Sequence, residues 1–315
     1  ANTRVRDMPP HNVAIIGAGS VGSTIASFLM WEGVFEEVLM VDIDMELCKG
    51  QVMDLSDASF LTDTAVRVGS FQDAANANIV IITAGAKQRK GETREKLLKR
   101  NVKILRAISN SMGTVSEHTI VLLVANPVDI LTQVFQEISG IPKTRVIGSG
   151  TFLDSMRLRT DISRRLDVAV SHVHAYVVGM HGDCQVALFS NAQIAGVSVS
   201  EYGKLKEKDL KQIADDTRDK AYKIIKAKGS TYYGIGACVA KLSRGMMQDR
   251  RGVFQLSVWS DKYGCYLSWP SLVGSKGIIK LIPLQLKSSE EQVVARAAQI
   301  IKKGATEALR PAAKM

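Results

Sequence analysis

A glycine-rich turn directly after a short apolar run is the feature that most constrains how this chain folds. Residues 13–16 read Val-Ala-Ile-Ile, and Gly17, Gly19 and Gly22 follow in the spacing G-x-G-x-x-G. Such a run is typical of a parallel strand covered on both faces. The first glycine permits a tight turn, the second lets a pyrophosphate approach the backbone, and the third lets the next helix pack closely. The pattern predicts a strand, turn and helix that bind a dinucleotide at the helix N-terminus.

An acidic residue after the next apolar run indicates which dinucleotide binds. Residues 37–41 are mostly apolar, and Asp42 follows them, about twenty residues beyond Gly22. A carboxylate at this position accepts hydrogen bonds from the adenosine ribose and repels a 2'-phosphate, so NAD is predicted rather than NADP. The alternative is a structural glycine turn with an unrelated surface aspartate, because 25 glycines in 315 residues produce such spacings by chance.

Strand-length apolar runs continue along the first half of the chain and alternate with segments of helical periodicity. The predicted strands are 65–68, 78–83, 119–125 and 145–148. The predicted helices are 45–59, 95–112, 128–137, 153–166, 209–227, 232–247 and 289–309. This alternation predicts an α/β fold with a doubly wound parallel sheet, which binds ligands at the carboxyl ends of its strands. Gly85 and Asn126 follow two of these strands and are expected at that edge.

A basic segment lies just before the predicted helix 95–112. It contains Lys87, Arg89, Lys90 and Arg94, with Gly91 as a hinge. Positive charge is disfavoured at a helix N-terminus by about 0.3 to 1 kcal/mol per group. Local violations of this kind are expected at functional sites. The alternative is an ordinary basic loop on the surface.

Composition excludes several classes of protein. The chain is 46% hydrophobic, enough for two lobes that share one large core, but its apolar runs are too short to span a bilayer. Its four cysteines are widely separated, which predicts a cytoplasmic protein without disulfides or a thiolate metal site. The net charge of +10 fits anionic ligands or a solvated basic surface. Nucleic-acid binding is not predicted, because the lysines are spread along helices and no aromatic and basic module is present.

Several longer segments resemble the L-lactate dehydrogenase family of the lactate/malate dehydrogenase superfamily. They are Val-Ala-Asn-Pro-Val-Asp-Ile-Leu at 124–131, Gly-Ser-Gly-Thr-Phe-Leu-Asp-Ser-Met-Arg at 148–157, Gly-Met-His-Gly-Asp at 179–183 and Lys-Gly-Ser-Thr-Tyr-Tyr-Gly-Ile at 228–235. The resemblance covers nearly the whole chain. It implies an NAD-binding Rossmann domain at 1–148, whose residues 1–11 form a loose arm, and an α+β substrate domain at 149–315.

The resemblance also implies the residues that carry out the chemistry. His181 is expected to be the acid and base, and Asp154 to orient its ring and stabilise the imidazolium. Arg157 is expected to clamp the substrate carboxylate in a bidentate manner, since a guanidinium matches that geometry and a lysine does not. Arg94 is expected to polarise the substrate carbonyl, delivered by a mobile lid around Gly91.

The remaining implied contacts concern the substrate pocket and the cofactor. Asn126 is expected to bind the reacting oxygen, and Thr231 to line the pocket. The implied cofactor-binding residues are Gly17, Gly19, Val21, Gly22, Asp42, Gly85, Asn126 and Ser149. No metal is expected. Two positions depart from the family pattern, Phe152 in place of asparagine and Met180 in place of glutamate, and both flank catalytic positions without replacing them.

Gln88 decides between the two activities of the superfamily. Malate dehydrogenases resemble one another in carrying arginine six residues before the position of Arg94, and here that residue is neutral. A second substrate carboxylate would be desolvated and unpaired there, which costs several kcal/mol. Pyruvate and L-lactate are therefore the predicted substrates. A malate dehydrogenase is the alternative, and a non-catalytic NAD-binding protein is a further one from another class.

Regulation and assembly are expected from the same resemblance. Arg159 and His174 match positions that bind fructose 1,6-bisphosphate at a subunit interface in bacterial members, although relatives that are not regulated also carry this pair. The family is mostly tetrameric, so a homotetramer is predicted.

Overall fold

The computed structural model describes residues 11–86 and 91–310, and of Arg94 it describes the backbone only. The predicted loose arm at 1–11 lies almost wholly outside these residues. His11 is the exception, since its carbonyl oxygen accepts a hydrogen bond from the Glu36 N–H at 2.8 Å. His11 is therefore hydrogen-bonded to the rest of the fold and does not belong to a loose arm.

The first half of the chain forms a parallel sheet in the order β3-β2-β1-β4-β5-β6. Its strands are β1 (Asn12–Ile16), β2 (Glu37–Val41), β3 (Ala65–Val68), β4 (Ile79–Ile82), β5 (Ile120–Leu123) and β6 (Val146–Gly148). Its helices are α1 (Ser20–Glu32), α2 (Met45–Asp57), α3 (Phe71–Ala75), α4 (Arg94–Met112) and α5 (Val128–Ser139), with the 3-10 helix η1 (Ser59–Leu61). The chain crosses from β1 outward to β3 and then back to β4, so the order reverses between β1 and β4. The glycine turn after β1 lies at this switch point, where ligands bind in such sheets.

The second half continues the same sheet with antiparallel strands. Its strands are β7 (Val173–His174), β8 (Val177–Gly179), β9 (Gln185–Ala187), β10 (Gln193–Ile194), β11 (Val197–Ser198), β12 (Gly252–Ser260), β13 (Cys265–Gly274) and β14 (Gly277–Leu281). Ser257 of β12 pairs with Gly148 of β6, and the sheet continues through β13, β8 and β9. A separate small sheet has the order β11-β10-β7. The predicted boundary at 148/149 therefore lies within a continuous sheet rather than between two.

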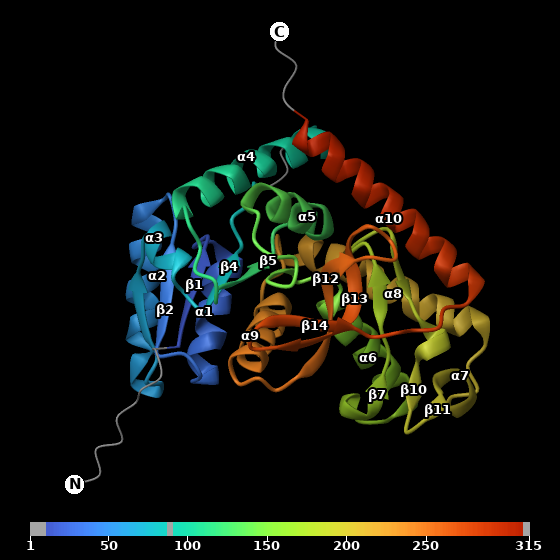
Figure 1. Ribbon diagram of the computed structural model, residues 1–315. Coiled ribbons are helices and arrows are strands. Elements are labelled where there is room, and N and C mark those ends of the chain that lie inside the picture. Colours follow the sequence, from blue (N-terminus) through green and yellow to red (C-terminus); the bar gives the residue numbers. More distant parts are fainter. Residues whose placement is uncertain (1–10, 87–90, 311–315) are drawn as a thin grey trace.

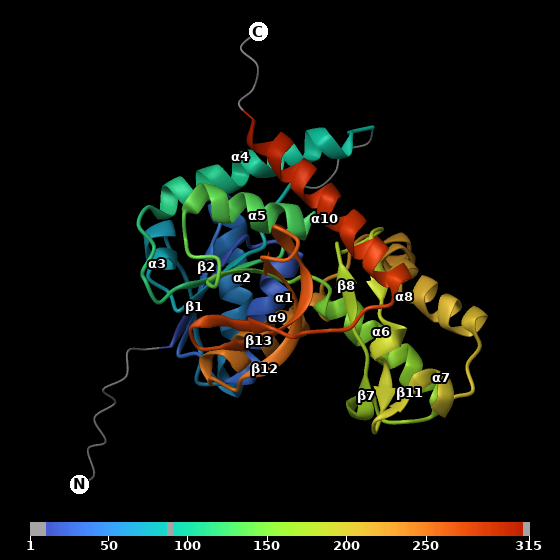
Figure 2. The same ribbon diagram turned by 45° about the vertical axis from the view of Figure 1, so that its right-hand side comes forward.

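Helices of the second half pack on the joined sheet and, in the case of α7, on the small sheet. They are α6 (Phe152–Leu166), α7 (Val199–Tyr202), α8 (Glu207–Lys228), α9 (Tyr233–Met247) and α10 (Ser288–Leu309), with the 3-10 helices η2 (Val170–His172) and η3 (Phe189–Asn191). Figure 1 shows α10 crossing toward α4 and α5, against which it packs. From the turned view in Figure 2 the three helices again lie side by side. Because α9 also packs against α1, the two halves are joined on both sides of the sheet.

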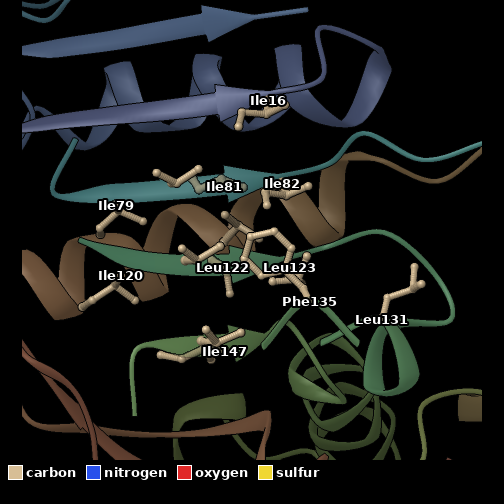
Figure 3. Close-up of a cluster of buried hydrophobic side chains, with 14 of the residues drawn as sticks. Ile16, Ile79, Ile81, Ile82, Ile120, Leu122, Leu123, Leu131, Phe135 and Ile147 are labelled. Carbon is tan, nitrogen blue, oxygen red and sulfur yellow. The ribbon is translucent and has the colours of Figure 1, made fainter. Parts of the chain in front are cut away.

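The core is built from the apolar strands that the sequence predicts. Figure 3 shows isoleucines and leucines of the neighbouring strands β1, β4, β5 and β6, with Phe135 of α5 next to Leu123. Ile15, Ile81 and Leu122 have no exposed surface, as expected for strands covered on both faces. Fully burying each such side chain contributes about 1.5 to 3 kcal/mol. Among the described residues, no helix is long and apolar enough to cross a membrane.

Candidate active site

The glycine turn has the geometry that its spacing predicts. Gly17 has a φ of +115°, and a Cβ on it would lie 2.5 Å from Thr83 Oγ1. A Cβ on Gly22 would lie only 1.9 Å from the carbonyl oxygen of Gly17, so helix α1 packs closer to β1 than any side chain allows. Apart from Gly19 itself and its chain neighbours, no atom of the described residues lies within 4 Å of a Cβ built on Gly19. The turn is therefore tight and helix α1 close, while open space remains over the second glycine, where a pyrophosphate would fit.

Asp42 lies beside this turn and is held in place by main-chain groups. Its Oδ2 accepts a hydrogen bond from the Ala18 N–H at 2.6 Å, and its Oδ1 accepts one from the Asp44 N–H at 2.9 Å. Each carboxylate oxygen retains a further lone pair, and the side chain is only half-buried. Asp42 is thus fixed at the end of β2 with capacity for ribose hydroxyls. Val21, also predicted to contact the cofactor, is half-buried in the first turn of α1.

A buried asparagine that the sequence analysis missed joins the neighbouring strand ends. Asn101 of α4 accepts a hydrogen bond from the Ala86 N–H at 2.7 Å and donates one to the Asn126 carbonyl oxygen at 3.1 Å. Nearby, a Cβ on Gly85 would lie 3.1 Å from the Ala125 Cβ. The loops after β4 and β5 are therefore held together at the sheet edge. No signal distinguished Asn101 in the sequence, because it appears there as an ordinary polar residue of a helix.

His181 and Asp154 meet, although 27 positions separate them in the chain. His181 lies in the turn between β8 and β9, and Asp154 in the first turn of α6. The His181 Nδ1 is 2.7 Å from Asp154 Oδ2. The carboxylate is almost completely buried, whereas 27% of the histidine side chain is exposed. A buried carboxylate thus orients an imidazole whose edge remains accessible.

The pKa values of this pair shift in opposite directions. Burial alone would raise the pKa of Asp154, but the His181 imidazole and the Arg157 guanidinium outweigh it and hold that pKa below its usual value. Burial would likewise lower the pKa of His181, and the negative charge of Asp154 outweighs it, so that the imidazole pKa is raised. The pair therefore favours an imidazolium next to a carboxylate.

Arg157 is a buried cation with few partners. Its Nη1 lies 3.4 Å from Asp154 Oδ1, and this is its only hydrogen bond among the described residues. A guanidinium has five N–H donors, so Arg157 has donors left for further partners beyond Asp154. Ser149, predicted to contact the cofactor, is buried directly after β6.

A cleft of about 700 Å³ lies next to His181, between helices α4, α8 and α10. Its described lining includes Asn126, Asp154, His181 and Met180. Thr231 lies in the connection between α8 and α9 and is not part of that lining. Three of the predicted residues thus meet at one cleft, and Thr231 does not join them there.

Two other predicted substrate residues cannot be placed. Gln88 lies outside the described residues, as does the side chain of Arg94, whose backbone begins α4. Within the described part of the chain, no group of three or more histidine, cysteine or acidic side chains could hold a metal ion.

Among the described side chains, no hydrogen bond connects the two candidate effector residues, Arg159 and His174. Arg159 Nε donates a hydrogen bond to the Ala175 carbonyl oxygen at 2.9 Å, and its guanidinium lies 5.5 Å from the Tyr176 ring. Burial lowers its pKa. His174 is exposed on β7 and forms no contact with Arg159 among the described side chains.

The two departures from the family pattern occupy different surroundings. Phe152 is buried at the start of α6, where its ring meets that of Phe254 edge to face at 5.1 Å. Met180 is only half-buried and lines the cleft directly before His181. Phe152 therefore takes part in the packing of the interior, whereas Met180 faces the cleft.

The glycine turn, the carboxylate beside it and the pair of His181 with Asp154 are the features expected of an NAD-dependent oxidoreductase, and the protein is a member of this class. Residues 11–148 match the NAD binding domain of lactate/malate dehydrogenase, and residues 151–310 match the alpha/beta C-terminal domain of the same enzymes. The chain belongs to the lactate/malate dehydrogenase family. The predicted fold class, family and cofactor are thereby confirmed.

Several L-lactate dehydrogenases are similar to this chain over nearly its whole length. L-lactate dehydrogenase A of Rhizopus oryzae is 40% identical, over 92% of this chain and 91% of its own length. L-lactate dehydrogenase of Lacticaseibacillus casei is 38% identical, over 96% of both chains. The crystal structure of the minor L-lactate dehydrogenase of Enterococcus mundtii, in a ligands-bound form, is 32% identical and superimposes with a TM-score of 0.91, over 96% of this chain and 99% of that one.

Proposed function

We propose that this protein interconverts pyruvate and L-lactate with NADH and NAD as the hydride carriers. Full-length similarity to L-lactate dehydrogenases supports this activity. The observation that carries the mechanism is the 2.7 Å contact between His181 and Asp154 at the edge of the cleft. It supplies an acid and base whose raised pKa suits proton transfer near neutral pH.

In the proposed reaction, His181 moves the proton. Its Nδ1 is engaged by Asp154, so its Nε2 is the nitrogen that donates a proton to the carbonyl oxygen of pyruvate. In the reverse direction it removes the hydroxyl proton of L-lactate. Asp154 keeps the ring in this orientation and stabilises the imidazolium without itself taking the proton.

Cations and an amide are proposed to orient the substrate. Arg157 binds the substrate carboxylate, a role supported by its burial and its unused donors. Asn126, at the carboxyl end of β5, hydrogen-bonds the reacting oxygen. Arg94 polarises the carbonyl from the start of α4, and Thr231 completes the pocket.

NAD fits the residues present and supplies the hydride acceptor when it is bound. The open space over Gly19 accommodates its pyrophosphate, and Asp42 retains lone pairs for its ribose. Val21, Gly85 and Ser149 line the remaining length of the proposed cofactor site.

Replacing the base tests this assignment. We expect His181→Gln to leave NADH binding within about threefold of the wild type while lowering kcat by about 10²- to 10⁴-fold, the contribution of a positioned acid and base. NADH fluorescence titration and an absorbance assay with pyruvate measure the two quantities. A loss of kcat below about fivefold would refute the role of His181.

Assembly into a homotetramer is proposed from the family and supported by an apolar surface on α1, α2 and η1. Trp31, Met53 and Phe60 are exposed there, Phe60 at 82% and Trp31 at 67%. Large apolar side chains exposed on neighbouring elements are typical of interfaces between proteins. A location in the cytoplasm is proposed as well.

Fructose 1,6-bisphosphate is proposed as an effector bound by Arg159 and His174 across a subunit interface. The exposure of His174 and the excess of positive charge support an anion site. Pyruvate saturation curves with and without the sugar bisphosphate test the idea. A lowered KM in its presence is the expected result, and superimposable curves would contradict it.

A further inference from the structure

A second buried carboxylate contacts His181, and the reaction described above does not use it. Asp129 Oδ2 accepts a hydrogen bond from the main-chain N–H of His181 at 2.8 Å. Its Oδ1 accepts one from the Ser268 hydroxyl at 2.8 Å. Only 1% of Asp129 is exposed. The catalytic histidine is therefore held at two points, its ring by Asp154 and its main chain by Asp129.

Three elements converge on the Asp129 carboxylate. Asp129 itself lies in the first turn of α5, three residues after Asn126. Ser268 lies on β13 and pairs in register with Gly179, two residues before His181. The carboxylate thus connects the turn that carries His181 with the helix that follows Asn126. A shift of Asp129 would change the distance between the acid–base group and the amide proposed to bind the same substrate oxygen.

Packing alone does not explain why a carboxylate occupies position 129. Burial raises its pKa, and the hydrogen bonds from the His181 N–H and the Ser268 hydroxyl oppose that rise. A main-chain N–H can only donate, so this contact suits the ionised carboxylate. An apolar or amide side chain would fill the same space without the cost of burying a charge.

The electrostatic surroundings of His181 come from several elements. Asp154 and Arg157 face it from α6, and Asp129 faces it from α5. Helices α4, α8 and α10 and the His181 turn add further charged residues to the cleft lining, namely Glu95, Lys99, Asp183, Arg218, Lys303 and Glu307. Asp129 differs from these residues because it is buried and hydrogen-bonded to the histidine main chain.

We propose that Asp129 is a positioning residue for His181, which fixes the catalytic imidazole relative to Asn126 and favours its protonated form through a buried negative charge. The inference rests on the proposed role of His181 as acid and base. By this proposal, a second carboxylate, from the first half of the chain, helps to set the position and the protonation of His181.

The isosteric change Asp129→Asn tests both parts of the proposal. The amide keeps an acceptor for the His181 N–H but removes the charge. We expect kcat for pyruvate to fall by about 10- to 100-fold, as for a small displacement of a catalytic group, while the NADH Kd stays within about threefold. Pyruvate reduction needs the protonated imidazole, so kcat/KM falls as pH rises through the His181 pKa. Without the charge that pKa is lower, and the midpoint should move to lower pH by about half a unit or more.

Glu290→Gln is a matched control. Glu290 is also buried, and it accepts hydrogen bonds from the main chain and the hydroxyl of Ser190, far from His181 in the chain. The same neutralisation should lower the melting temperature without moving the pH midpoint. If Glu290→Gln and Asp129→Asn move the midpoint equally, or neither moves it, the positioning role is refuted.

Ser268→Ala keeps the proposal testable if Asp129→Asn does not fold. It removes one of the two described hydrogen bonds that orient the carboxylate, and we expect kcat to fall about threefold at unchanged NADH Kd, as for one lost hydrogen bond. An unchanged kcat would overturn the proposal. A wild-type protein that fails to reduce pyruvate would instead refute the proposed function, so the two failures are distinguishable.

Discussion

At the scale of single residues, the site depends on two charges that stabilise each other. The pKa of His181 is raised, so its contribution to stability is fully present below its ordinary value of 6.5 and is lost as pH rises through the folded pKa. The pKa of Asp154 is lowered, so its contribution is present above its ordinary value of 3.8 and is lost as pH falls through the folded pKa. The pair therefore stabilises the fold most between these two ordinary values.

Asp154→Asn should show this pH window directly. We expect the difference in free energy of unfolding between wild type and variant to be largest at about pH 5 to 6 and to shrink above the raised pKa of His181. Urea unfolding at a series of pH values measures the difference. If the difference in free energy of unfolding were constant with pH, the charges of Asp154 and His181 would not stabilise each other in the folded protein.

The sequence identified some residues of the site and could not identify others. His181, Asp154 and Arg157 were predicted because they stand in recognisable motifs, and the structure brings them together. Their catalytic roles remain predictions. Asn101 and Asp129 were missed because their importance lies in partners 25 and 52 positions away. Such contacts form only on folding, and no local sequence pattern predicts them.

At the scale of elements, the predicted strands and helices of the first half match the structure to within a few residues, whereas the short helices α3 and η1 were not predicted. Strands β1, β4, β5 and β6 are buried almost throughout and so keep continuous apolar runs. The antiparallel strands β12 and β13 were not predicted. Polar residues such as Gln255, Ser257 and Ser268 are buried in them and interrupt the hydrophobic pattern. The alternation that usually identifies antiparallel strands is therefore absent.

The packing of α1 on β1 can be separated from phosphate binding by alanine substitutions. Gly22→Ala should lower both the melting temperature and NADH affinity, because its Cβ would meet the Gly17 carbonyl oxygen at 1.9 Å. Gly19→Ala should weaken NADH binding about tenfold or more and leave stability nearly unchanged, since within the described part of the chain its Cβ has no non-neighbouring atom within 4 Å. Gly50→Ala, in the open on α2, is the control and should preserve both. Normal NADH binding by Gly19→Ala would contradict the proposed phosphate site.

At the scale of the whole molecule, the two halves share one sheet and one core, and further copies are expected to cover the apolar surface on α1, α2 and η1. Light scattering should give about four times the chain mass of 34.3 kDa. Phe60→Glu should reduce that mass while circular dichroism stays unchanged, because the residue is already exposed. Ile279→Glu, on β14, provides a control at another exposed apolar residue. A wild-type monomer would contradict the proposed assembly.

The choice between pyruvate and oxaloacetate bears most directly on the proposed activity. Gln88 is neutral, so a second substrate carboxylate should remain unpaired, and Gln88→Arg should invert the preference. The decisive measurement is the kcat/KM of the wild-type protein for each oxo acid with NADH. We predict that pyruvate exceeds oxaloacetate by at least about a hundredfold, at about 1.4 kcal/mol per factor of ten. Equal values for the two substrates would contradict the lactate dehydrogenase assignment in favour of malate dehydrogenase.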